Sequence, residues 1–252
     1  MLSLSSLEVF NTKIHIGTYD DLLQIISEVI ETNKTVSIDT SNTMIVSLAV
    51  IDNNFHAALK SFDILVPDSM PLVWYLRLLG GNIKDTCYGP ETALRVWNKF
   101  SETNKIIIIG SDQETQALFE SKYKKPVKWI TSNIDPDNFE TIEWLEKEIQ
   151  EVDPDIIFLG LGCPKSYYLL QRLQSRIKRG VIIHVGGSFD LISGKNKITP
   201  VKMQKLGLGW LFRLCEEPKR LFPRYLKYNS LFILFVLLYY FKNKKNNKFV
   251  KR

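Results

Sequence analysis

The chain has 252 residues and a net charge of +6, a length that suits one sizeable α/β domain with an appendage. The charge is uneven: residues 197–252 hold 14 Lys and Arg against two acids, and the remainder is net acidic. No G-x-x-x-x-G-K-[ST] motif occurs, which leaves a P-loop nucleotidase unsupported, and no signal peptide is expected. Three scattered cysteines (Cys87, Cys163 and Cys215) favour reduced thiols in a cytoplasmic protein.

Short apolar runs alternate with helical patterns through most of the chain. The run from Leu22 to Ile30 keeps helical spacing after Thr18, and Pro71 and Pro90 suit the first turns of two further helices. Strands are expected at 36–38, 63–66, 106–109, 127–131, 155–159 and 181–185, with helices between them, including 138–151. This alternation predicts an α/β, Rossmann-like fold with a mostly parallel sheet and helices on both faces.

Two glycine turns close the last two of these strands. They read G-L-G-C-P-K at 160–165 and G-G-S-F-D at 186–190. Ligands of open α/β sheets bind outside the carboxyl ends of the strands, and glycine there lets backbone N–H groups approach an anion closely. We therefore expect a phosphate-bearing small molecule as substrate. The alternative, a glycine needed only for a tight turn, explains one glycine better than two.

The C-terminal region combines an apolar run with basic residues. Residues 231–241 are 11 consecutive apolar residues, and six Lys or Arg follow them. A membrane-spanning helix needs roughly 20 apolar residues, so even the uncharged stretch 228–241 is too short. We expect a helical, membrane-associating appendage over 197–252, attached to a catalytic domain over 1–196 and attracted to anionic lipid. The alternative is a core helix with a basic end.

Polar motifs follow the predicted strands in a definite order. They are Thr40-Ser41-Asn42, Pro67-Asp68, Gly89-Pro90-Glu91, the two glycine turns, a G-L-G-W-L-F-R-L segment at 207–214, and Glu217-Pro218-Lys219-Arg220. Each motif alone is weak. Their order and spacing, from about Thr40 to Arg224, closely resembles the WecG/TagA/CpsF family of bacterial glycosyltransferases.

The resemblance implies an inverting, metal-independent transfer of a sugar, usually N-acetylmannosamine, from a UDP-sugar donor. The implied acceptor is N-acetylglucosamine linked to undecaprenyl diphosphate or a similar polyprenyl diphosphate, in the synthesis of cell-surface polysaccharide, capsule or teichoic acid. No cofactor or metal is expected. The implied location is cytoplasmic, peripherally associated with the inner face of the cell membrane. A homo-oligomer is left open.

The resemblance also assigns catalytic roles. Asp68 matches the family's proposed catalytic aspartate, which takes the proton of the acceptor hydroxyl. The alternative for Asp68 is an N-cap of the helix near Pro71. Thr40 and Asn42 match the T-x-N motif that faces the donor sugar and the acceptor, and their alternative is a turn that satisfies its own backbone.

Further residues are expected to bind substrate. Lys165 has a surface lysine as its alternative, and the basic residues of the appendage have a solvated basic face near anionic lipid as theirs. The expected binding residues are Glu91, Gly162, Lys165, Gly186, Gly187, Ser188, Asp190, Arg213, Arg220 and Arg224, with Lys219 as a further candidate.

The chain departs from the family pattern at two polar positions. Thr86 stands where the family usually has an arginine, and Ser166 where it usually has a glutamine. The alternative function is therefore a catalytically weakened homologue that binds nucleotide-sugar or anionic lipid without turnover. Nucleic-acid binding by the basic tail is disfavoured because the basic residues flank an apolar run.

Two patterns are set aside as decoys. Asp135-Pro-Asp137 and Asp153-Pro-Asp155 imitate an Asp-x-Asp metal motif, but a central proline before an element favours a turn. His184 lies inside a buried-type strand, without metal-ligand spacing, and is expected to be a satisfied core residue.

Overall fold

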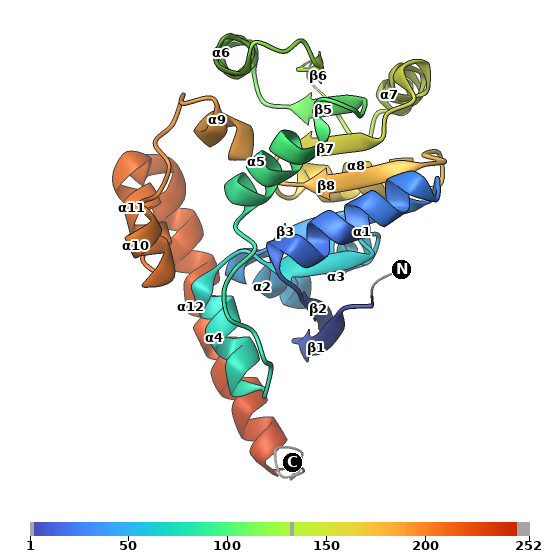
Figure 1. Ribbon diagram of the computed structural model, residues 1–252. Coiled ribbons are helices and arrows are strands. Elements are labelled where there is room, and N and C mark those ends of the chain that lie inside the picture. Colours follow the sequence, from blue (N-terminus) through green and yellow to red (C-terminus); the bar gives the residue numbers. More distant parts are fainter. Residues whose placement is uncertain (1–2, 132–133, 246–252) are drawn as a thin grey trace.

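A computed structural model describes residues 3–131 and 134–245 of the chain (Figure 1). Within them the strands are β1 (Ser5–Val9), β2 (Thr12–Ile16), β3 (Thr35–Ser41), β4 (Ile64–Pro67), β5 (Ile106–Gly110), β6 (Lys128–Ile130), β7 (Ile156–Gly160) and β8 (Gly180–His184). The helices are α1 (Tyr19–Glu31), α2 (Thr43–Ile51), α3 (Asn53–Leu59), α4 (Met70–Leu78), α5 (Gly89–Phe100), α6 (Gln113–Tyr123), α7 (Phe139–Val152), α8 (Lys165–Leu173), α9 (Ser188–Ile192), α10 (Val201–Lys205), α11 (Gly209–Glu216) and α12 (Pro218–Lys245).

Six strands form one sheet in the order β4-β3-β8-β7-β5-β6, and every neighbouring pair is parallel. The predicted α/β class with a mostly parallel sheet is thus confirmed. Because parallel strands end at the same edge of a sheet, the polar loops after β3, β4, β7 and β8 gather at one edge.

The sheet is buried on both faces, which is why its strands are apolar at nearly every position. In β5, Ile107 and Ile109 pack into one core and Ile106 and Ile108 into the other. Residues of α2, α3, α7 and α8 belong to the first core, and residues of α1, α5, α6 and α9 to the second.

No element was predicted before residue 18 or between residues 42 and 63. The structure places the antiparallel hairpin β1–β2 in the first region, where the Leu65 N–H donates to His15 Nδ1 at 3.1 Å and fixes the hairpin beside β4. The second region holds α2 and α3. In α2, buried residues occur on almost every side of the helix, so helical periodicity is absent from its sequence.

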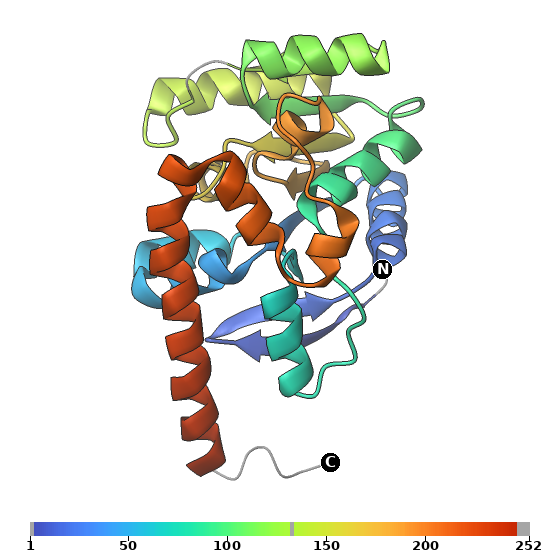
Figure 2. The ribbon, with the colours of Figure 1, turned by 90° about the vertical axis from the view of Figure 1, so that its left-hand side faces the viewer.

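The predicted apolar run is the second half of α12, which extends along the side of the molecule past the hairpin (Figure 2). Its inner side packs on the hairpin: the Phe10 ring lies 5.6 Å from that of Phe232 and 5.7 Å from that of Phe235. The helix therefore has the packed side of a core helix, whereas Leu234, Leu237 and Leu238 are exposed on its other side.

Candidate active site

A cavity of about 790 Å³ lies at the carboxyl ends of β3, β4, β7 and β8, and residues of α10, α11 and α12 line it as well. The body and the C-terminal helices thus build one site. Eleven of the sequence-predicted residues line this cavity: Thr40, Asn42, Asp68, Gly162, Gly186, Gly187, Ser188, Asp190, Arg213, Arg220 and Arg224. Their individual roles stay predictions.

Asp68 follows β4, and hydrogen bonds hold both its backbone and its side chain. Its N–H donates to the Ser41 carbonyl at 2.7 Å, and its Oδ1 accepts the Gly89 N–H at 2.7 Å. Helix α4 begins at Met70 with Ser69 at its N-cap, so the alternative that Asp68 caps this helix is wrong. Burial raises the pKa of Asp68 to about 7, against the opposing effects of the Gly89 hydrogen bond and the Arg213 charge.

Thr40, Asp68 and Ser188 all lie close to Gly89. A Cβ atom built on Gly89 would lie 3.1 Å from both Thr40 Oγ1 and Ser188 Oγ, so a side chain at this position would press on two cavity-lining hydroxyl groups. Thr40 Oγ1 donates to the His184 carbonyl at 3.2 Å, and Ser188 Oγ donates to the Val185 carbonyl. The backbone itself therefore orients these hydroxyls.

Asn42 joins the site to α2. Its Oδ1 accepts the Met44 N–H at 3.0 Å and the Ile45 N–H at 3.3 Å. The alternative was a turn that satisfies its own backbone; the N–H groups that Asn42 satisfies instead belong to the start of helix α2. Asn42 nevertheless lines the cavity. One residue later, Thr43 Oγ1 donates to Asn229 Oδ1 of α12 at 3.2 Å, so this loop contacts the C-terminal helix.

The second glycine turn forms another part of the wall. Gly186 has φ +54°, a conformation that favours glycine, and its neighbour Gly187 is exposed to the cavity. Asp190 Oδ1 accepts the Thr115 hydroxyl at 2.8 Å, which ties this turn to α6. Glycines with accessible N–H groups beside a fixed carboxylate suit a ligand that has both phosphates and hydroxyls.

The C-terminal helices place three guanidinium groups against the cavity. Arg213 comes from α11, and Arg220 and Arg224 come from α12. Glu217 lies between the first two: its carboxylate is 3.4 Å from Arg213 Nη2 and accepts a hydrogen bond from Arg220 Nε at 2.6 Å. Arg224 contacts the Met44 sulfur at the start of α2. Guanidinium groups in this number suit phosphate oxygens.

Part of the cavity lining is apolar. Met44, Met70, Pro71, Phe232 and Ile233 form this part, from α2, α4 and α12. The cavity therefore offers both charged groups and a hydrocarbon surface, a combination that fits a ligand with a phosphate next to an apolar chain.

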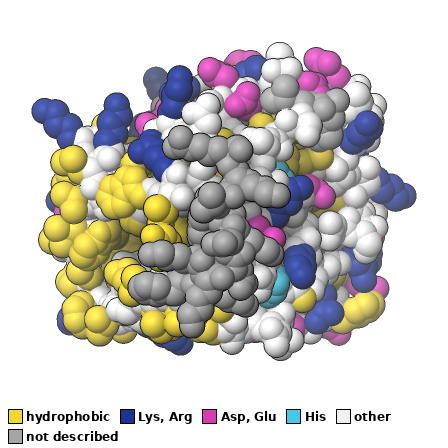
Figure 3. Space-filling model, turned by 90° about the horizontal axis from the view of Figure 1, so that it is seen from below, with side chains coloured by type: hydrophobic (Ala, Val, Ile, Leu, Met, Phe, Trp, Pro, Cys, Tyr) yellow, Lys and Arg dark blue, Asp and Glu magenta, His cyan; other side chains and the backbone are white. Residues whose placement is uncertain are grey.

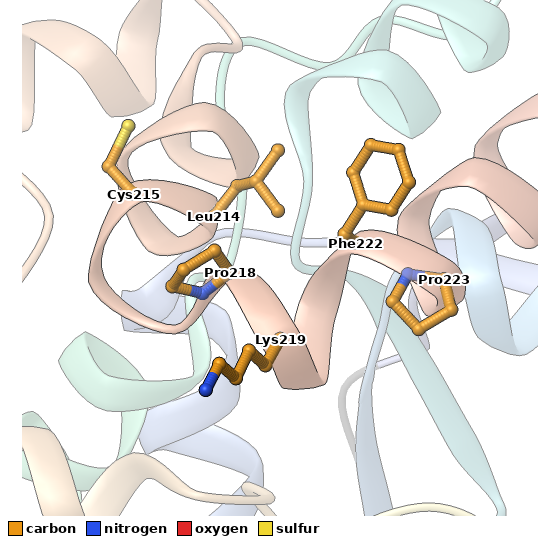
Figure 4. A pocket seen from close by; sticks show the side chains of 6 residues that line it. All are labelled: Leu214, Cys215, Pro218, Lys219, Phe222 and Pro223. Carbon is orange, nitrogen blue, oxygen red and sulfur yellow. The ribbon is translucent and has the colours of Figure 1, made fainter.

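Three predicted binding residues lie elsewhere. Glu91 pairs with Arg95 along α5, Oε1 to Nε 2.6 Å, and Lys165 is exposed at the start of α8. Lys219 lines a second hollow of about 550 Å³ at the corner of α11 and α12, together with Leu214 and Phe222 (Figure 4). None of the three is among the residues that line the large cavity. The sequence could not show this, since the order of motifs does not fix the direction of a side chain.

The two departures from the family pattern have different positions. Thr86, where the resemblance led us to expect an arginine, lines the cavity, so the residue type at this position bears directly on the site. Ser166 is fully buried in α8 and is not among the lining residues, and its Oγ has no hydrogen-bond partner among the described residues.

A buried network lies behind the site. Asp39 accepts the Tyr167 hydroxyl at 2.8 Å, accepts the Ser41 hydroxyl, and pairs with His184 Nδ1 at 2.6 Å. His184 also lines the cavity, and its Nε2 has no partner among the described residues, so the expectation of a satisfied core histidine is only half right. The sequence signal was its place, two residues before the Gly186-Gly187 turn.

The decoy carboxylates form turns and ion pairs. Asp135 accepts the Asp137 N–H at 3.0 Å, as a turn starter does, and Asp153 and Asp155 both pair with Arg179. Within residues 3–131 and 134–245, no three His, Cys, Asp or Glu side chains are placed to hold a metal ion.

The outer side of α12 forms part of an apolar surface. Figure 3 shows hydrophobic side chains gathered on the side of the molecule where α4, α11 and α12 lie. The segment Pro218–Tyr240 has a mean hydropathy of 1.3 and the length of a membrane-spanning helix. The expectation that the C-terminal apolar stretch is too short to span a membrane counted only residues 228–241, and the helix begins earlier, at Pro218. Lys248, Lys251 and Arg252 of the predicted basic end lie outside the described residues.

The chain is similar to known N-acetylmannosaminyltransferases. N-acetylglucosaminyldiphosphoundecaprenol N-acetyl-beta-D-mannosaminyltransferase of Bacillus subtilis (strain 168) is 28% identical over 187 residues, 73% of this chain and 72% of that protein. The protein of the same name from Bacillus spizizenii is 24% identical over 193 residues, 76% of this chain and 75% of that one. The sequence profile of the Glycosyl transferase WecG/TagA/CpsF family matches residues 7–246, and the chain therefore belongs to this family of glycosyltransferases.

Proposed function

We propose that this protein transfers N-acetylmannosamine from a UDP-sugar to N-acetylglucosamine carried on a polyprenyl diphosphate, in the synthesis of cell-surface polysaccharide or teichoic acid. The names of the Bacillus relatives support both the sugar and the acceptor. The observation that carries the proposal is the position of Asp68: a carboxyl with a pKa raised to about 7 lines the same cavity as three arginines and an apolar wall.

Asp68 is the proposed general base. Its Oδ1 is occupied by the Gly89 N–H, which leaves Oδ2 to take the proton of the acceptor hydroxyl. As that proton leaves, the hydroxyl oxygen attacks the anomeric carbon of the donor sugar. The bond from this carbon to the diphosphate oxygen breaks, and its electron pair leaves with UDP. Attack opposite the leaving group inverts the anomeric centre, and a base with a pKa near the working pH suits this step.

The departing UDP gains negative charge that the site must stabilise. Arg213, Arg220 and Arg224 supply positive charge at the cavity, and N–H groups of the turn at Gly186 and Gly187 supply hydrogen-bond donors. We propose that these groups take the role that a divalent cation has in other sugar transfers, so that the reaction proceeds without added metal.

The lipid part of the acceptor is proposed to approach from the C-terminal helices. Ile233 of α12 lines the cavity, and the next residues of the same helix include the exposed Leu234, Leu237 and Leu238. We propose that residues 197–252 act as a membrane-associating appendage to a catalytic body over residues 1–196. In this arrangement α12 lies at the inner membrane face and brings the cavity to the lipid-linked substrate.

A second candidate function is supported by Thr86. This residue lines the cavity in place of an arginine, so a protein that binds nucleotide-sugar without turnover is the competing proposal. The three arginines of α11 and α12 favour the transferase, because they supply cationic charge at the same cavity.

One assay separates the two proposals. Purified protein is mixed with UDP-N-acetylmannosamine and a lipid-linked N-acetylglucosamine analogue in EDTA, and UDP release and the disaccharide product are measured. The transferase predicts both products in equal amounts, with inverted configuration at the transferred sugar. Binding of the donor without product, across a panel of UDP-sugars, supports the non-catalytic proposal instead.

A further inference from the structure

The ion pairs around Glu217 bring two of the cavity arginines together. We propose that Glu217 is a positioning residue, which holds the guanidinium groups of Arg213 and Arg220 as one unit for a bound diphosphate. The inference deepens the proposed function and rests on it for the source of the diphosphate, which is either the nucleotide-sugar or the lipid-linked acceptor.

Glu217 occupies the corner between two helices. It follows Glu216, the last residue of α11, and precedes Pro218, the first of α12. Its N–H donates to the Arg213 carbonyl at 2.9 Å, and its carbonyl accepts the Leu221 N–H at 3.0 Å. The backbone at this corner is therefore fixed on both sides, which fixes the direction in which the side chain leaves it.

The two oxygens of the carboxylate bind different arginines. Oε1 lies 3.4 Å from Arg213 Nη2, whereas Oε2 lies 2.6 Å from Arg220 Nε and 2.5 Å from Arg220 Nη2. A guanidinium group has five N–H donors. Glu217 therefore occupies one edge of Arg220 and a single nitrogen of Arg213, and the remaining donors are left for a ligand.

Charge supports positioning. Arg213, Arg220 and Arg224 line the cavity together with Glu217, and these four side chains have a net charge of +2. A diphosphate esterified at both ends carries two negative charges, as in a nucleotide-sugar or a lipid-linked sugar. The carboxylate thus brings two long side chains together and still leaves a charge that matches such a ligand.

The ion pairs of Glu217 restrict the arginine side chains before a ligand binds. The Arg220 side chain is 56% exposed, and a long exposed side chain loses rotamer freedom when it binds a ligand. Because Glu217 already restricts Arg220 and Arg213, less of this entropy is lost when the diphosphate arrives. Removal of the carboxylate then weakens diphosphate binding, although it adds positive charge to the cavity.

The neighbouring glutamate supplies a matched control. Glu216 stands beside Glu217 at the same corner, but its Oε1 pairs with Lys197 at 3.2 Å, and neither of these two residues is among those that line the cavity. Glu216→Gln removes the same charge from the same place in the chain. It leaves the ion pairs of Glu217 with Arg213 and Arg220 in place.

The test measures binding of two probes, each added alone, to the full-length chain by calorimetry: UDP-N-acetylmannosamine for the donor side and farnesyl-diphosphate-linked N-acetylglucosamine for the acceptor side. We expect Glu217→Gln to weaken one of them about fivefold to tenfold, and Glu216→Gln to bind both like the parent. In an Arg220→Gln background, Glu217→Gln should cost less than about twofold, because Glu217 acts through Arg220. The affected probe identifies the diphosphate.

A conservative variant separates bridging from charge alone. Glu217→Asp keeps the charge but shortens the side chain, so we expect it to bind like Glu217→Gln, with a raised KM and a smaller change in kcat. Parent-like binding by Glu217→Asp overturns the proposal. So do tighter binding by Glu217→Gln, an equal loss in the Arg220→Gln background, an equal loss in Glu216→Gln, or a parent protein that binds neither probe.

The proposed function and this inference fail separately. If the parent binds a probe with the expected pattern across the variants but transfers no sugar, the transferase proposal fails and the role of Glu217 stands. If sugar is transferred and binding is additive across the Glu217 and Arg220 variants, Glu217 has no positioning role. Melting temperatures of all variants are recorded so that any unfolded protein is left out of the comparison.

Discussion

Asp39 and His184 are register partners on the neighbouring parallel strands β3 and β8, and their side chains meet at 2.6 Å in the buried interior. Asp39 also accepts the hydroxyls of Ser41 and Tyr167, so three side chains meet at this one carboxylate. The pair therefore joins the ends of two strands whose next residues, Thr40 and Val185, line the cavity.

This network predicts a loss of stability in Tyr167→Phe. The aromatic ring and its contact with His184, at 4.8 Å between ring centroids, are kept, while the hydroxyl that donates to Asp39 is lost. A hydrogen bond to a buried charged group contributes about 1.5–3 kcal/mol, so we expect the free energy of unfolding in urea to fall by about that amount. Tyr168→Phe, at the next and less buried position of α8, is the control and should change stability little.

A second prediction concerns pH. Burial raises the pKa of Asp68 from its model-compound value of 3.8 to about 7. Since a base must be deprotonated to accept a proton, kcat/KM for sugar transfer should fall about tenfold per pH unit below 7 and level off above it. A profile that stays flat from pH 5 to 8 contradicts the assignment of Asp68 as the base.

Removal of this carboxylate gives a third prediction. Asp68→Asn keeps the size of the side chain and a carbonyl oxygen that can accept the Gly89 N–H, but it cannot take a proton. We expect kcat to fall by about 10²–10⁴, with UDP affinity nearly unchanged. Asp85→Asn, an exposed carboxylate on the loop before α5, is the control and should retain full activity. Equal rates for Asp68→Asn and the parent remove Asp68 from the mechanism.

The sheet was predictable because local signals agree along it. Ile106 to Gly110 illustrates this: an apolar run too short for a helix ends at a glycine, and the structure has a strand there. The hairpin β1–β2 and helix α2 were not predicted. Helix α2 contacts α12 and α3 and belongs to the core on one face of the sheet. A helix buried nearly all round has no polar face to reveal its period.

The motifs predicted many of the residues that line the cavity, but not the contacts of their side chains. Motif order identified Asp68 and Arg213, which lie on elements far apart in the chain and line one cavity. It also predicted that Glu91 and Lys219 bind substrate, although Glu91 pairs with Arg95 and Lys219 lines another hollow. The direction of a side chain depends on its position around the helix and on its ion-pair partner, and a short sequence motif contains neither.

The exposed side of α12 leads to the last prediction, which concerns membrane binding. Leu234, Leu237 and Leu238 are each about half exposed, while Phe232 and Phe235 on the inner side pack against the hairpin. Truncation of the helix would expose that packing, so substitution of the outer leucines is the cleaner test. Half of a leucine side chain contributes about 1 kcal/mol on transfer out of water, so the triple change to Gln should weaken binding to anionic vesicles about 100-fold.

Two controls make the result specific to this face. The same triple change at Leu118, Phe139 and Trp144, exposed residues of α6 and α7, should leave vesicle binding unchanged. The α12 variant should still act on a short-chain acceptor in solution, because its cavity residues are intact. Since α12 carries basic residues as well as the leucines, a higher salt concentration should weaken the binding of the parent protein to anionic vesicles. Unchanged vesicle binding by the α12 variant shows that another surface holds the protein to the membrane.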